Sequence, residues 1–144
     1  MSRGVLSACE EAEVVALFLV AENGQPDYLG YIFGNGLTDI ALAKSKRNYL
    51  AYAKLQPSAI SHLHYRQPLP ELVQGRTSIY RAGPLHWEQR FRTGLSCLCY
   101  DVGDLFDTLW QHPSLRLPGT LIYQGADRNS ADAGIQLSHG DTVV

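Results

Sequence analysis

The sequence predicts an α+β fold, a single domain with a mainly antiparallel sheet, one longer helix and one short helix. The length of 144 residues suits one domain. Short segments rich in β-branched and aromatic residues are separated by turn residues, as in antiparallel sheets. The expected elements run strand, strand, helix and then mostly strands, and this order favours hairpins over parallel β-α-β units.

A hairpin and the longer helix come first. Residues 14–21 are apolar and β-branched, which is typical of a buried strand, and residues 28–33 form the second strand. Residues 22–26 contain Asn-Gly and a proline, so we expect the turn there. Thr38 is a suitable N-cap for a helix over residues 39–55, which is rich in Ala, Leu and Lys.

The second half of the chain holds shorter elements. Periodicity alone does not decide whether residues 85–92 form a helix or a strand. The other expected elements are strands at 59–66, 77–81, 95–100 and 119–124 and a short helix at 104–112, which a proline ends. We expect the ordered core to span about residues 12–125, with a loose lead over 1–9 and a mobile tail over 126–144.

Composition indicates a soluble, intracellular protein. The longest apolar run is too short to span a membrane. Glu10, Glu11 and Glu13 precede it, where a signal peptide carries positive charge, so we expect a cytoplasmic location and no membrane partner. Three cysteines are an odd number and do not suggest a disulfide framework.

Basic residues gather in the middle third of the chain, which we call the basic segment. Residues 43–92 contain nine of the twelve Lys and Arg residues but only two acids, whereas the net charge of the whole chain is −2. The segment either forms a basic surface for an anionic partner or is neutralised within the domain by the acidic ends.

If residues 59–66 form a strand, His62, His64 and Arg66 share one face. Two imidazoles on one face can bind a metal, but the neighbouring guanidinium repels a cation and favours an anion. We therefore expect no metal and no cofactor. The candidate ligand-binding residues are His62, His64, Arg66, Arg81, Lys44, Arg47 and Lys54.

Catalysis is an alternative use of the same face. Acid–base chemistry on a phosphate needs a base and an acid on opposite sides of the reacting group, which two neighbours on one strand supply poorly. His86 is a possible second partner. The candidate catalytic residues are His62, His64, Tyr80 and His86.

The sequence favours a small binding or regulatory protein over an enzyme. The basic, aromatic-rich segment would contact an anionic protein, a nucleic acid or a small molecule, although a pI of about 6.2 is low for a nucleic-acid-binding domain. One alternative is a metal-independent enzyme that acts on a phosphate or carboxylate substrate through His62, His64 and Arg66. Another is a structural subunit of a homo-oligomer such as a homodimer.

Overall fold

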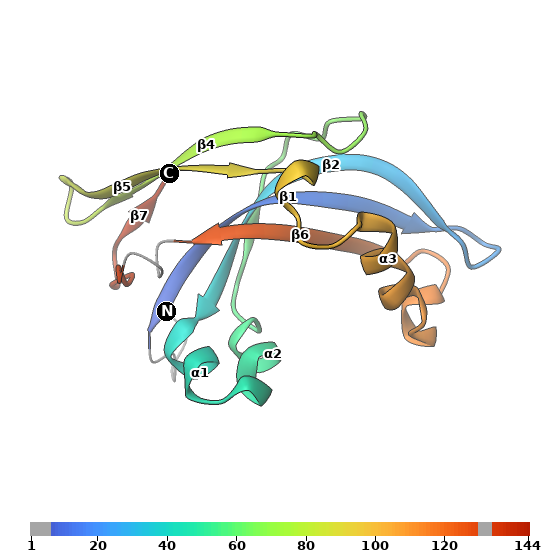
Figure 1. Ribbon diagram of the computed structural model, residues 1–144, viewed down its shortest axis with the longest axis horizontal. Coiled ribbons are helices and arrows are strands. Elements are labelled where there is room, and N and C mark those ends of the chain that lie inside the picture. The colour runs from blue at the N-terminus through green and yellow to red at the C-terminus, as the bar shows by residue number, and fades with distance from the viewer. Residues whose placement is uncertain (1–6, 130–133) are drawn as a thin grey trace.

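The computed structural model describes residues 7–129 and 134–144, which form two antiparallel sheets and several short helices (Figure 1). One sheet has the strand order β3-β2-β1-β6 and the other β5-β4-β7. Every pair of neighbouring strands is antiparallel. The predicted α+β domain with a mainly antiparallel sheet is confirmed.

The predicted hairpin forms the centre of the larger sheet. Strand β1 spans Ala8–Val20 and β2 spans Pro26–Asp39, joined by a turn in which Gly24 has a φ of 75°. Both strands are longer than predicted. Ala8 and Cys9 are fully buried within β1, so this part of the expected loose lead is wrong, while residues 1–6 lie outside the described residues.

The helical region after β2 is broken into short pieces. Helix α1 spans Ile40–Ser45, a 3₁₀ turn covers Arg47–Tyr49, and α2 spans Leu50–Ala53. The prediction of one helix over 39–55 is therefore wrong. Lys46 adopts an extended conformation that interrupts the helix, and Ala53 is the only fully buried residue among these helical pieces.

The predicted strand at 59–66 is mostly wrong. Strand β3 contains only Ala59–Ile60. The Ser61 hydroxyl accepts a hydrogen bond from the Phe33 amide and donates one to the Leu63 carbonyl, two residues further on. This local hydrogen bond bends the chain over residues 62–64. The chain returns to β2 at Tyr65, which forms an isolated antiparallel bridge with Tyr31.

The second sheet contains the hairpin of β4 (Val73–Tyr80) and β5 (Leu85–Thr93), so residues 85–92 are a strand. The predicted strand at 95–100 is wrong, because Leu95–Cys97 form a 3₁₀ turn. The turn follows Gly94, whose φ is 115°, and the Leu95 and Ser96 amides bond to the Pro70 and Glu71 carbonyls.

The remaining elements close the fold. Helix α3 spans Val102–Trp110, near its predicted place, and a 3₁₀ turn covers Pro113–Arg116. Strand β6 (Leu121–Asn129) pairs with β1, and β7 (Thr142–Val143) pairs with β4. The ordered fold thus extends beyond residue 125 into the expected tail, of which residues 130–133 lie outside the described residues.

Most of the buried apolar residues belong to β1 and β2. The fully or nearly fully buried apolar residues include Val14, Val15, Val20, Ile32 and Ile79. None of the helices in the described ranges is long and apolar enough to cross a membrane.

Candidate functional site

Two acidic side chains share one face of the long hairpin with two glycines. In the register of β1 and β2, Glu11 pairs with Gly36 and Glu13 pairs with Gly34. Directly paired residues of antiparallel strands point to the same side of the sheet. Because glycine has no side chain, β2 leaves space beside both carboxylates.

The two carboxylates converge at Gly36. A Cβ atom at this position would lie 3.1 Å from Oε1 of Glu13 and 3.2 Å from Oε2 of Glu11. A Cβ atom at Gly34 would lie 3.4 Å from Oε2 of Glu13. Glycine at these positions therefore lets two negatively charged side chains approach the same small region of the sheet surface.

Lys54 contributes a positive charge to this group. It is the C-cap residue of α2, and its Nζ donates a hydrogen bond to Oε2 of Glu11. The Glu11 side chain is 4% exposed, whereas the Lys54 side chain is 42% exposed. A carboxylate this deeply buried needs a compensating charge, which Lys54 supplies from the solvent side. We call Glu11, Glu13 and Lys54 the carboxylate–lysine cluster.

A buried hydroxyl lies beside the cluster on the same face. Thr38 pairs with Cys9, and Cys9 shares the face of Glu11 because it is two residues away on β1. Thr38 is 1% exposed, and its Oγ1 has no hydrogen-bond partner within the described parts of the chain. Buried polar atoms are almost always hydrogen-bonded, and this hydroxyl is one of the exceptions among the described residues.

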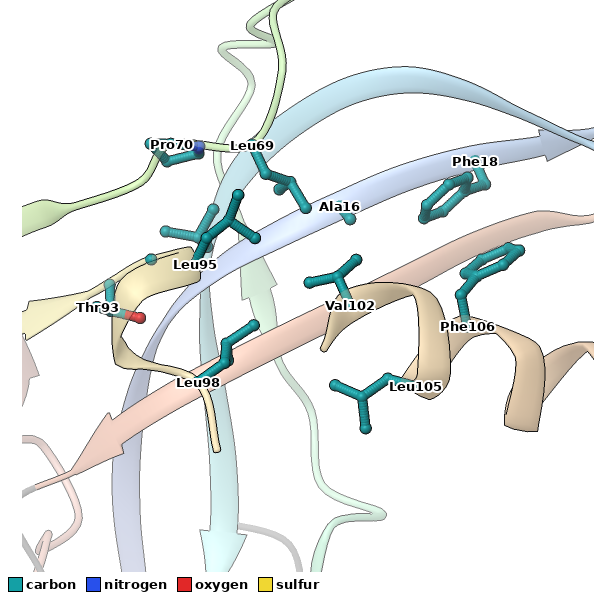
Figure 2. A pocket seen from close by; sticks show the side chains of 12 residues that line it. Ala16, Phe18, Leu69, Pro70, Thr93, Leu95, Leu98, Val102, Leu105 and Phe106 are labelled. Carbon is teal, nitrogen blue, oxygen red and sulfur yellow. The ribbon is translucent and has the colours of Figure 1, made fainter. Parts of the chain in front are cut away.

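The opposite face of β1 packs against α3 (Figure 2). The rings of Phe18 and Phe106 pack with centroids 4.3 Å apart and their planes tilted by 34°. A cavity of about 50 Å³ remains there, too small for a sugar acid, and its lining contains no charged side chain. This face is core packing, whereas the carboxylate–lysine cluster lies on the other face.

The three residues that were predicted to share a strand face do not do so. His62, His64 and Arg66 are exposed and lie beyond the end of β3. Nε2 of His64 lies 2.8 Å from the Leu29 carbonyl oxygen, which fixes the ring against β2. None of the three lines the α3 cavity. None lines the neighbouring surface depression between Tyr28 and Tyr100 either.

The other predicted residues are dispersed. Lys44 is exposed on α1 and Arg47 is exposed on the following 3₁₀ turn. Tyr80 is half-buried at the end of β4, and His86 is exposed near the start of β5. Only Lys54 of the predicted set belongs to the carboxylate–lysine cluster.

Two of the basic residues pair with acids from the two ends of the chain. Lys54 binds Glu11, and Arg81 binds Asp141 with an Nη2–Oδ2 distance of 2.8 Å. The hydrogen bond from Arg81 lowers the pKa of Asp141 to about 2, although burial acts in the opposite direction. At these positions the acidic ends neutralise the basic segment, as the second interpretation of the charge pattern proposed.

Comparison with known proteins establishes the fold. No family model and no curated protein sequence matches the chain. A solved structure described as "2-keto-3-deoxy-D-arabinonate dehydratase complexed with magnesium and 2,5-dioxopentanoate" matches 97% of the chain with a TM-score of 0.72 and 17% identity. A hexagonal crystal form of 2-keto-3-deoxyarabinonate dehydratase matches the same share with a TM-score of 0.71 and 18% identity. The fold is similar to about half of a dehydratase chain, since 49% and 47% of those two chains are covered.

This comparison corrects the predicted function. A binding or regulatory protein with a basic surface was expected, but the fold is shared over nearly the whole chain with enzymes. The charge pattern misled the prediction because Lys54 and Arg81 are paired within the fold.

Magnesium, which is bound in one of the similar structures, does not fit the side chains that the structure describes around Glu11 and Glu13. Among the side chains that the structure describes, which leave out those of residues 121–129, no group of three His, Cys, Asp or Glu could hold a metal. The carboxylates that the hairpin places on this face are Glu11 and Glu13, and the Lys54 ammonium binds Glu11. A neighbouring positive charge repels a divalent cation, so we derive no reaction step through magnesium.

The sequence prediction used Glu11 and Glu13 only as evidence against a signal peptide and as counter-charges to the basic segment. Two signals could have identified them as a site. Acids two residues apart in a strand share one face, and Gly34-Asn35-Gly36 places glycine at the alternate positions of the expected partner strand. Recognising the site also required the strand register and Lys54, which is 43 residues away from Glu11.

Proposed function

We propose that this chain is an enzyme, or the site-bearing part of one, that removes water from a small 2-keto acid of the 3-deoxy sugar acid class. The observation that carries the proposal is the buried Glu11 carboxylate, paired with Lys54 and adjacent to Glu13 on a glycine-lined face. The likeness to dehydratases over 97% of the chain supports the reaction class.

The cluster has the groups that such an elimination needs. The Lys54 ammonium attracts the anionic end of a keto acid and stabilises negative charge that develops on the keto oxygen. The Glu13 carboxylate takes a proton from the carbon next to the keto group, which leaves an enolate. The enolate electrons then form a carbon–carbon double bond as the neighbouring C–O bond breaks, and the hydroxyl group takes the proton from Glu13 and leaves as water.

Glu11 positions Lys54 in this scheme. Its own backbone amide donates a hydrogen bond of 3.1 Å to Oδ1 of Asn35, which ties β1 to β2 at the site. The buried carboxylate then fixes one end of a lysine side chain that is otherwise long and mobile. The ammonium is thereby oriented before the substrate arrives, which is how an electrostatic group becomes effective in catalysis.

The test is proton exchange followed by turnover. The 144-residue chain is mixed with 2-keto-3-deoxy-D-arabinonate in D₂O, and proton NMR follows both deuterium incorporation beside the keto group and loss of substrate. We expect both to exceed the buffer rate and to fall by roughly 10²- to 10⁴-fold in Glu13→Gln, the usual contribution of a general base. Glu88→Gln, which changes an exposed acid on β5, is the matched control and keeps the wild-type rate.

Exchange no faster than in buffer, or a Glu13→Gln variant as active as the wild type, would contradict the proposal. Circular dichroism of each variant shows whether a loss of rate reflects unfolding. Lys54→Met should raise KM more than Glu13→Gln does, because it removes the charge that attracts the substrate.

A further inference from the structure

The carboxylate–lysine cluster, on which the proposed function rests, also indicates which positive group neutralises Glu11 and Glu13. Glu11 and Glu13 approach the same point above Gly36, an arrangement that needs positive charge nearby. Either a divalent cation or an ammonium group can supply it. In this chain, Nζ of Lys54 binds Oε2 of Glu11, one of the two oxygens that converge there.

We infer that the Lys54 ammonium is the resident cation of this site, and that the site is built to work without a bound divalent metal. Magnesium binds through near-octahedral oxygen ligands and gives up its water reluctantly. It would have to displace an ammonium group that is already in place and tethered to the protein.

The helix holds the ammonium group in position. Lys54 directly follows Ala53, which is fully buried, and its amide bonds to the Leu50 carbonyl oxygen at 3.3 Å. The backbone of Lys54 is thus fixed to the end of α2, and its side chain reaches across to β1. A tethered charge competes with free ions at a high effective concentration.

Gly36 decides which cation the site prefers. A carboxylate here would lie between Glu11 and Glu13 and would complete a set of three acidic ligands. The φ of Gly36 is outside the left-handed region, so another residue can adopt its backbone conformation. A Cβ atom would be 3.1 Å and 3.2 Å from two carboxylate oxygens, so those flexible side chains would have to move by a few tenths of an ångström.

The experiment measures magnesium binding directly, by calorimetry and by the melting temperature of the 144-residue chain in up to about 10 mM Mg²⁺, well above the need of a built site. We expect no saturable binding by the wild type. Lys54→Met leaves two carboxylates without the ammonium group, and Gly36→Asp adds a third. Each variant should bind Mg²⁺ at least tenfold more tightly than the wild type.

Lys44→Met is the matched control, because it removes an exposed lysine charge from α1 and should gain no affinity. Saturable binding by the wild type that Glu11→Gln abolishes would overturn the inference. So would a folded Lys54→Met and a folded Gly36→Asp that both bind no better than the wild type. If Lys54→Met does not fold, Gly36→Asp and the wild-type titration still decide the question.

The inference and the proposed function fail in different ways. A chain without exchange activity refutes the dehydratase proposal, while the magnesium titration still reports on the cation. Tight magnesium binding by the wild type refutes the inference. The exchange assay then still tests the proposed dehydratase activity independently.

Discussion

Replacing Lys54 by Met tests how strongly the cluster depends on its positive charge. The change keeps a long side chain but leaves the Glu11 carboxylate, 4% exposed, without this partner. Breaking a fully buried pair costs about 3–5 kcal/mol, whereas exposed pairs contribute about 0.2–1 kcal/mol. Because Lys54 is 42% exposed, water partly replaces it, and we expect a loss of roughly 2 kcal/mol in the free energy of unfolding.

The loss is measured by urea denaturation at neutral pH, and in a domain of this size it lowers the melting temperature by about 6 °C. A double-mutant cycle with Glu11→Gln separates the pair from other contacts of either residue. The double variant should be more stable than the sum of the two single losses predicts, by about 1 kcal/mol or more. Lys54→Met within about 0.5 kcal/mol of the wild type would refute the reasoning, because that is the usual effect of a surface substitution.

Three further changes test the fold. The pKa of Asp141 is lowered from 3.8 to about 2, so its pairing with Arg81 stabilises the protein above pH 3.8 and the gain is lost between pH 3.8 and about 2; Asp141→Asn should remove this part of the pH dependence of urea stability, and an unchanged profile would contradict it. Gly30→Ala should destabilise by at least about 2 kcal/mol, because the φ of Gly30 is 130° and a Cβ atom would collide with the Tyr65 carbonyl oxygen; a melting temperature like that of the wild type would be the contrary result. Ile79→Ala should lose about 2–5 kcal/mol because Ile79 is fully buried, and a loss below about 1 kcal/mol would show that its site is loosely packed.

The hairpin could be predicted because its signals are local. Residues 14–21 are apolar and β-branched, and the Asn-Gly sequence in the turn favours positive φ. The actual strands, Ala8–Val20 and Pro26–Asp39, are longer than predicted. The first of them includes Glu10 and Glu11, which are buried inside the sheet, and burial is unusual for acids. Composition alone places such residues outside a strand.

The errors at residues 59–66 and 95–100 have tertiary causes. The alternation around His62 resembles a strand, but the hydrogen bonds of the Ser61 hydroxyl interrupt the strand after Ile60, and the chain pairs with β2 again only at Tyr65. The apolar run from Leu95 would suit a strand, yet the carbonyl groups of Pro70 and Glu71 bind the amides that a neighbouring strand would have used. Phe33 lies 28 residues from Ser61, and Pro70 and Glu71 are similarly remote in sequence from the amides that they bind, so periodicity could not reveal these partners.

The candidate site depends on strand register more than on residue type. Side chains alternate along a strand, so a shift of one residue would turn Glu10 toward the glycines and Glu11 away from them. Both acids are buried, at 1% and 3% exposure, and the neighbouring apolar residues Val14 and Val15 are buried on opposite faces. Because neither face of β1 is purely polar, the hydrophobic pattern does not set the register. The pairing of Glu11 with Gly36 favours this register at this end of the hairpin, since a residue with a side chain would push the two carboxylates aside by a few tenths of an ångström. The glycine that opens the face is thus also a reason why the acids point into it.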